Sequence, residues 1–142
     1  MYTLGVKHNI EVAHRLSQLE GKCQNIHGHS MLVTLSFHGG QLDEFGVYEG
    51  MPFKEIKNAF RHHLDSQYDH HLLLNENDPW AHATDLGGKP CSLPGLMKCA
   101  ADPTTENLAT WIQQWAKLEF GMEKTIEIEL WETAVNMASV IS

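Results

Sequence analysis

Two histidines separated by one glycine follow closely after a cysteine in the segment GKCQNIHGHS, residues 21–30. Imidazole nitrogens are common ligands of Zn²⁺, and a thiol can ligate a metal or act as a base or nucleophile. If this segment is extended, His27 and His29 point to the same face, because successive side chains of a strand alternate. A short HGH motif also suits ordinary hydrogen-bonded histidines at a strand end, so a metal site needs further ligands.

His14 is a third histidine in phase with this pair. The segment from Leu4 to His14 follows a mostly period-2 pattern in which His14 shares the face of Ile10 and Val12. If this strand pairs as a hairpin with the one after the HGH motif, three imidazoles meet at one end of an apolar surface. This arrangement predicts a His₃ metal site with one coordination position open. Cys23 fits either a fourth, structural ligand or a free base or nucleophile, and its spacing is compatible with both.

Three carboxylates are further candidates for chemistry. Asp69 directly precedes His70 in YDHH, an order that suits an acid/base group with an orienting carboxylate, or a simple polar turn. Glu132 continues the face of the core residues in TIEIELWET, where a carboxylate requires a partner with N–H donors, unless the strand ends at Trp131 and Glu132 turns to water. Glu106 falls in the first turn of an expected helix, where it complements the helix dipole or caps the helix.

Alternating strand and helix patterns predict the elements that position these residues. Strands are expected over residues 4–14 and 31–37, in TIEIELWET and in NMASVIS, and helices over about 52–66 and from the DPTT segment at 102–105 to near Gly121. HGGQLDEFG is expected to be a turn or loop, and residues 75–103 an irregular connection. His62 and His63 on the first helix are expected to face solvent. The order is therefore ββααββ.

Composition restricts the class of protein. The chain has 142 residues, of which 42% are hydrophobic, and this predicts a single globular domain over residues 1–142. A formal net charge of −8 argues against nucleic-acid binding. The apolar runs are too short to span a membrane and no signal-peptide pattern is present, so we expect a cytoplasmic protein without membrane contact. Three cysteines without CxxC spacing argue against a disulfide framework or a thiolate zinc site.

Five ordered motifs resemble the 6-pyruvoyl-tetrahydropterin synthase / 6-carboxy-tetrahydropterin synthase family. They are AHRL at 13–16, GKCQNIHGH at 21–29, DHHLLLN at 69–75, PTTEN at 103–107 and ET at 132–133. The resemblance implies the α+β tunnelling fold, in which a four-stranded antiparallel sheet carries two helices on one face. It also implies a homo-oligomer, a trimer or a dimer of trimers, whose sheets close into a barrel with active sites at subunit interfaces. Such closure removes exposed sheet edges.

The resemblance also implies roles for individual residues. The implied ligands of one Zn²⁺ per chain are His14, His27 and His29. Cys23 matches the catalytic base, and Asp69 with His70 matches a pair that completes the proton-transfer machinery from a neighbouring subunit. His70 is preferred to His71 because it directly follows Asp69. Glu132 matches the carboxylate that anchors the pterin. The segment that helps to line the pterin pocket contains Thr105 and Glu106.

The spacing between Cys23 and the HGH motif distinguishes two branches of the resembled family. Three residues separate them here, as is typical of 6-carboxy-tetrahydropterin synthases, whereas 6-pyruvoyl-tetrahydropterin synthases typically have five. The resemblance thus favours a carbon–oxygen lyase that converts 7,8-dihydroneopterin triphosphate to 6-carboxy-5,6,7,8-tetrahydropterin on the route to queuosine. A 6-pyruvoyl synthase and a non-catalytic pterin- or zinc-binding homologue remain alternatives. Arg15 and Lys22 are candidates for holding the triphosphate.

Overall fold

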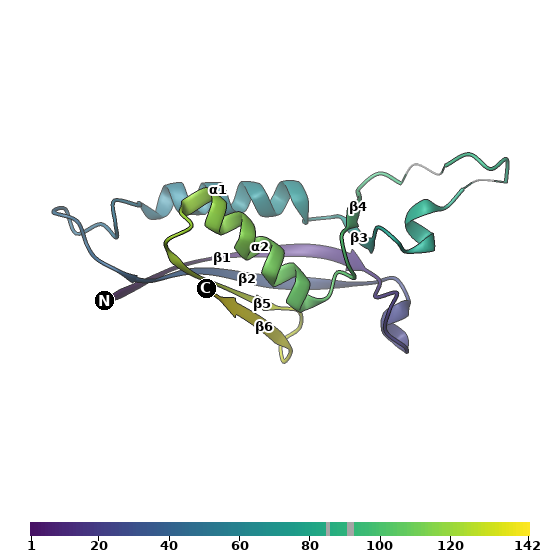
Figure 1. The fold of residues 1–142 in the computed structure, drawn as a ribbon, viewed down its shortest axis with the longest axis horizontal. Coiled ribbons are helices and arrows are strands. Elements are labelled where there is room, and N and C mark those ends of the chain that lie inside the picture. Colours follow the sequence, from purple (N-terminus) through teal and green to yellow (C-terminus); the bar gives the residue numbers. More distant parts are fainter. Residues whose placement is uncertain (85, 91–92) are drawn as a thin grey trace.

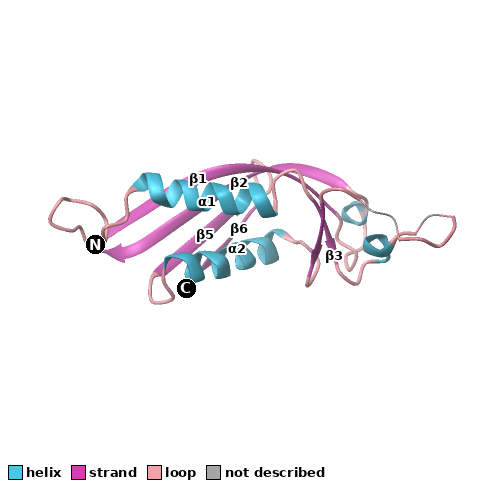
Figure 2. Cartoon of the chain, turned by 90° about the horizontal axis from the view of Figure 1, so that it is seen from above, coloured by secondary structure: helices cyan, strands magenta, loops and turns pink. Residues whose placement is uncertain are grey.

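The computed structural model describes residues 1–84, 86–90 and 93–142. Within these residues, a six-stranded mixed sheet carries two long helices on one face (Figures 1 and 2). The strands are β1 Tyr2–His14, β2 His27–Gly40, β3 Leu72–Asn75, β4 Leu96–Cys99, β5 Thr125–Trp131 and β6 Met137–Ile141. The helices are α1 Phe53–Gln67 and α2 Thr105–Phe120, and the 3₁₀ turns are η1 Lys22–Gln24 and η2 Pro79–His82.

The β1–β2 hairpin is the longest pairing in the sheet. Its antiparallel register runs from Tyr2 opposite Gly40 to His14 opposite His27. The fully buried side chains of β2 alternate with less buried ones, as the period-2 pattern predicts. Strand β2 is longer than expected, because it begins within the HGH motif and includes both glycines of the expected HGG turn. The three candidate metal ligands therefore lie on regular strand backbone at one end of the hairpin.

Both helices bury their apolar stripes against the same face of the sheet. The buried residues that they contribute to one core cluster are Ile56, Phe60 and Leu64 of α1 and Leu108, Ala109, Ile112 and Ala116 of α2. Burial of a large apolar side chain contributes about 1.5–3 kcal/mol, so this stripe anchors each helix. Helix α2 starts where predicted, since Thr104 Oγ1 accepts a hydrogen bond from the Asn107 N–H, and it ends at Gly121. No helix in the described part of the chain is long and apolar enough to cross a membrane.

The expected four-stranded antiparallel sheet is wrong in its number of strands. Strands β1, β2, β5 and β6 form that antiparallel part, but β3 and β4 extend it beside β1, in the order β4-β3-β1-β2-β5-β6. The added strands run parallel, and β3 pairs with β1 only at Ala13 and His14. Leu73 and Leu74 are both buried, so this strand shows an apolar run instead of alternation. Connection 75–103 is thus partly regular, and Cys91 within it lies outside the described residues.

His63 does not face solvent as expected. Its ring stacks on Trp115 of α2, with centroids 4.0 Å apart and an interplanar angle of 1°. The His63 ring also makes a T-shaped contact with the Tyr68 ring, and its buried Nε2 has no hydrogen-bond partner. Burial lowers the pKa of His63 to about 4. His63 therefore acts as an aromatic packing residue between the helices, whereas His62 is exposed as expected.

We expect His63 to make the stability of the fold dependent on pH. Its pKa falls from an ordinary 6.5 to about 4 on folding, so the unfolded chain binds more protons between these values. The free energy of unfolding should therefore decrease as the pH is lowered through this window. His63→Phe retains the stacked ring without the titration, and urea unfolding should show a weaker pH dependence for this variant. Parallel pH profiles for the two proteins would contradict this assignment.

Candidate active site

The structure brings the ring nitrogens of His14, His27 and His29 together at the end of the β1–β2 hairpin. One ligand atom from each ring lies within 4.8 Å of the others. His14 is fully buried and the other two are partly buried. The register places His14 opposite His27, and the strand period returns His29 to the same face. This group of three imidazoles could hold a metal ion.

Backbone carbonyls fix the orientation of two of these rings. Nδ1 of His14 donates to the Pro103 carbonyl at 2.8 Å, and Nδ1 of His27 donates to the Asn25 carbonyl at 2.8 Å. A carbonyl oxygen only accepts, so each Nδ1 carries the hydrogen and each Nε2 keeps a lone pair. Burial lowers the pKa of His14, which favours the neutral ligand form.

The free nitrogens of the cluster fit a bound cation. The Nε2 atoms of His14 and His29 are buried without a hydrogen-bond partner. An unsatisfied buried polar group costs about 1–3 kcal/mol, and a metal ion held by three imidazole nitrogens would remove this cost. The donor set is that of a site with one position left for water or substrate.

Glu132 faces the histidine cluster although its strand has ended. Strand β5 stops at Trp131, and the Glu132 N–H donates to the Asn136 carbonyl in the following turn. The carboxylate nevertheless does not turn to water. Its Oε1 lies 3.7 Å from Nε2 of both His14 and His29, and the side chain is 20% exposed. A hydrogen-bond acceptor therefore lies at the edge of the cluster.

Cys23 lies in the exposed turn η1, which leads into β2. Its thiol is free, and its carbonyl accepts a hydrogen bond from the Leu16 N–H at 2.9 Å. The bond between Asn25 and His27 connects the end of this turn to the cluster. Among the described residues, the group of side chains close enough to share a metal contains the three histidines and does not include Cys23.

Asp69 and His70 form a hydrogen-bonded pair that the backbone of β1 holds in place. The Glu11 N–H donates to Asp69 Oδ1 at 2.7 Å, and the His70 N–H donates to the Glu11 carbonyl at 2.6 Å. His70 Nδ1 donates to Asp69 Oδ2 at 2.7 Å. These contacts hold His70 at a φ of 59°, a left-handed conformation that is unfavourable for most non-glycine residues. The carboxylate thus orients the imidazole and leaves its Nε2 available.

The pair is electrostatically coupled. Partial burial raises the pKa of Asp69, but the hydrogen bonds from Glu11 and His70 outweigh it and lower the pKa below its ordinary value. The hydrogen bond to Asp69 and the charge of this carboxylate raise the pKa of His70. An exposed imidazole with a raised pKa is a suitable proton donor and acceptor near neutral pH.

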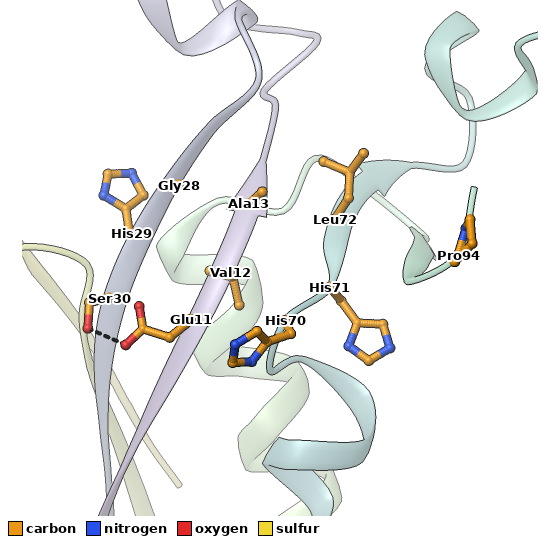
Figure 3. Close-up of a pocket in the computed structure, with 10 residues that line it drawn as sticks. All are labelled: Glu11, Val12, Ala13, Gly28, His29, Ser30, His70, His71, Leu72 and Pro94. Carbon is orange, nitrogen blue, oxygen red and sulfur yellow. Dashed lines mark hydrogen bonds between the residues drawn. The ribbon is translucent and has the colours of Figure 1, made fainter.

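His70, and not His71, presents its ring to open solvent. The His70 side chain is 78% exposed, whereas His71 is partly buried and its Nδ1 donates to the Asp69 carbonyl. His70 lines a cavity of about 530 Å³ together with Glu11 and Ser30 (Figure 3). In Figure 3, strands β1 and β2 lie between His29 and His70. His29 of the histidine cluster also lines this cavity.

Thr105 and Glu106 open α2 beside the cluster. Thr105 is the first residue of the helix, two positions after Pro103, whose carbonyl contacts His14. Glu106 is exposed in the first turn, where its charge complements the N-terminal end of the helix dipole. The structure thus brings the start of this helix to the same end of the sheet as the three histidines.

Sequence reasoning missed the backbone groups that orient the site. The carbonyls of Pro103 and Asn25 hold two imidazoles, and the peptide groups of Glu11 hold the Asp69–His70 pair. Every residue has a carbonyl, so residue types carry no signal for these contacts. The proximity of the PTTEN motif to the cluster is a consequence of tertiary packing.

Comparison with known proteins identifies the family. Residues 3–141 match the profile of the family described as 6-pyruvoyl tetrahydropterin synthase. The chain belongs to this enzyme family. It is 29% identical over 143 residues to a 6-carboxy-5,6,7,8-tetrahydropterin synthase of Synechocystis sp., an alignment that covers 100% of this chain and 95% of the relative.

Two further comparisons agree. A 6-carboxy-5,6,7,8-tetrahydropterin synthase of Rickettsia felis is 26% identical, with 87% of this chain and 88% of the relative covered. The solved structure of 6-pyruvoyl tetrahydropterin synthase from Plasmodium falciparum superposes with a TM-score of 0.73 at 18% identity, over 99% of this chain and 97% of the other. At this identity the structural likeness shows a shared fold, and the tunnelling fold expected from the sequence is consistent with it.

We expect Asp69 to control the protonation of His70. Asp69→Asn removes the charge that favours the imidazolium, so the pKa of His70 should fall from its raised value toward the ordinary 6.5. NMR titration of the His70 ring protons measures this directly on the resting protein. The same pKa in both proteins would show that the carboxylate does not govern the imidazole.

Proposed function

We propose that the protein is a 6-carboxy-5,6,7,8-tetrahydropterin synthase. It would convert 7,8-dihydroneopterin triphosphate to 6-carboxy-5,6,7,8-tetrahydropterin, with release of acetaldehyde and triphosphate, as a step of queuosine biosynthesis. The observation that carries the proposal is the cluster of three histidines, in which the unpartnered Nε2 atoms of His14 and His29 lie beside the Glu132 carboxylate. Similarity to curated 6-carboxy synthases over most or all of the chain, and the three residues between Cys23 and His27, support this branch of the family.

Zn²⁺, at one ion per chain, is the metal that we assign to this cluster. Neutral imidazoles suit zinc, and three of them leave a position for an oxygen of the substrate. When bound, the ion would polarise oxygens of the substrate side chain and acidify the adjacent C–H. The hydrogen bond from His14 to Pro103 fixes the tautomer and the direction of the buried ligand, as such outer contacts do in metal sites.

Glu132 is the group that we assign to substrate anchoring. A pterin presents adjacent N–H donors on its guanidine-like edge, and a carboxylate accepts two such hydrogen bonds in parallel. The Glu132 side chain is only 20% exposed and carries a charge, so a ligand with N–H donors is a suitable partner. Thr105 and Glu106, at the start of α2, would line the same pocket.

Cys23, Asp69 and His70 are the residues that we assign to proton transfer. Cys23 lies on the exposed turn joined to the cluster and would remove a proton from the substrate side chain. His70 keeps Nε2 free to accept or return a proton, while Asp69 holds Nδ1. In Figure 3 strands β1 and β2 pass between the rings of His70 and His29, and we assign the Asp69–His70 pair to the site of a neighbouring chain in a homo-oligomer.

A product assay tests the proposed reaction. The zinc-loaded protein should convert 7,8-dihydroneopterin triphosphate into a product whose mass corresponds to a carboxyl group at C6, with one acetaldehyde released per turnover. A product that retains the three-carbon side chain would identify a 6-pyruvoyl synthase and overturn this assignment. Absence of any product while zinc and pterin still bind would indicate a non-catalytic homologue.

Paired substitutions separate the base from the metal ligands. Cys23→Ala should lower kcat by at least about 100-fold, as expected for loss of a general base, and leave zinc content near one per chain. His27→Ala should lose both zinc and activity, because the remaining two imidazoles are too few for a stable site. Metal analysis by mass spectrometry distinguishes the two outcomes. Loss of zinc from Cys23→Ala would instead make the thiol a ligand.

A further inference from the structure

The turn that carries Cys23 has little packing of its own. None of the residues Lys22–Gln24 is buried, so hydrophobic contacts do not fix the turn. Hydrogen bonds attach it at both ends to the chain around it. They include the Leu16 N–H to the Cys23 carbonyl at 2.9 Å, His27 Nδ1 to the Asn25 carbonyl at 2.8 Å and Arg15 Nη1 to the Gln24 carbonyl at 3.1 Å. Of these donors, only Arg15 reaches the turn from a long, flexible side chain.

The Arg15 guanidinium is itself held on two further sides. Its Nε donates to Asp78 Oδ2 at 2.8 Å, and the Asp78 carboxylate is completely buried. The guanidinium carbon lies 4.7 Å from the centroid of the Trp80 ring, a cation–π contact. The other oxygen of Asp78 accepts the Trp80 N–H, so the two partners of Arg15 are fixed relative to each other. The Arg15 side chain is 16% exposed.

This geometry indicates a role for the segment that follows β3, which contributes both partners of Arg15. Asp78 and Trp80 lie at the start of η2, within the connection whose purpose the sequence leaves open. A planar guanidinium can donate in two directions while its face stacks on an aromatic ring, which a lysine ammonium cannot reproduce. Asp78 and Trp80 of the connection therefore fix the Arg15 guanidinium. In this position Arg15 donates to the carbonyl of Gln24, the residue after Cys23.

We propose that Arg15, which Asp78 and Trp80 hold in place, is a positioning residue that fixes the Cys23 turn relative to the histidine cluster. The inference rests on the proposed function, in which Cys23 is the base. A base must lie within hydrogen-bond reach of the proton it removes, and small displacements of the reacting groups are costly for the rate. Two of the five N–H donors of Arg15 are thereby used by Asp78 and the Gln24 carbonyl.

Arg15→Lys tests this role in the full-length, zinc-loaded protein. We expect kcat to fall by about 10- to 100-fold, as a misplaced base predicts, with KM for the pterin triphosphate nearly unchanged. Amide hydrogen exchange of residues 21–25, measured without substrate, should become about tenfold faster after loss of one charge-assisted hydrogen bond. Zinc content should remain near one per chain. Because Arg15→Lys keeps the positive charge, faster exchange at the turn would report the lost hydrogen-bond geometry and not a change of charge.

Arg61→Lys is the matched control, since Arg61 pairs only loosely with Asp65 at 3.4 Å and its side chain is 71% exposed. This variant should leave kcat and exchange at the turn unchanged. Trp80→Ala is a second test, because it removes the aromatic ring that contacts Arg15. Trp80 is 50% exposed, so its removal should not unfold the chain. It should change kcat and exchange in the same direction as Arg15→Lys, by a smaller factor.

Distinct outcomes overturn the two proposals. Wild-type kcat and unchanged exchange at residues 21–25 in Arg15→Lys would disprove the positioning role. Equally faster exchange throughout the sheet, with a lowered Tm, would also disprove it, because Arg15 would then serve only overall stability. If the wild-type protein does not turn over the pterin triphosphate, the proposed function fails, and exchange at the turn still decides whether Arg15 holds it.

Discussion

The antiparallel register of the β1–β2 hairpin is the constraint on which the candidate site depends. It sets His14 opposite His27 and Val12 opposite His29, so the three imidazoles share the face that also carries the core. A slip of one residue would move the side chains of one strand to the opposite face and separate the ligands. The alternating apolar side chains of both strands oppose such a slip, because they would leave the core. Folding and metal-site assembly therefore rest on the same interaction.

A buried polar junction at the start of α2 links the hairpin end to the rest of the protein. Asp102 accepts hydrogen bonds from the Gln18 N–H, the Ser17 hydroxyl and the Asn75 side chain. Burial raises the pKa of Asp102, but these hydrogen bonds outweigh it and keep the pKa below its ordinary value. The next carbonyl along the chain, that of Pro103, orients His14. One junction thus fixes the loop after β1, the end of β3 and the buried histidine.

The functional residues of the candidate site differ in how deeply they are buried. His14 is enclosed by the core and held by a helix start, whereas Cys23 is on an exposed turn and His70 is on an exposed corner. At both exposed positions, hydrogen bonds to the backbone hold the residues in place where hydrophobic packing does not. Leu16 bonds to the Cys23 turn, and Glu11 bonds to Asp69 and His70. A metal needs ligands in fixed geometry, while groups that move protons must reach the substrate. The buried His14 therefore suits a metal ligand, and the exposed Cys23 and His70 suit proton transfer.

The sequence by itself determined the antiparallel strands, both helices and the in-phase histidines, because period 2 and helical spacing report directly which side chains share a face. It also supplied the ordered motifs that resemble the family. Tertiary structure decided what such patterns do not encode. The apolar run of β3 lacks alternation, so its parallel pairing beside β1 was missed, and His63 was placed in solvent although Trp115 covers it.

Only the tertiary structure showed that Glu132 faces the cluster after its strand has ended, and that Arg15 is seated on Asp78. Both depend on contacts between segments that are distant in sequence. Such contacts depend on how the whole fold packs, so local periodicity in the sequence cannot predict them.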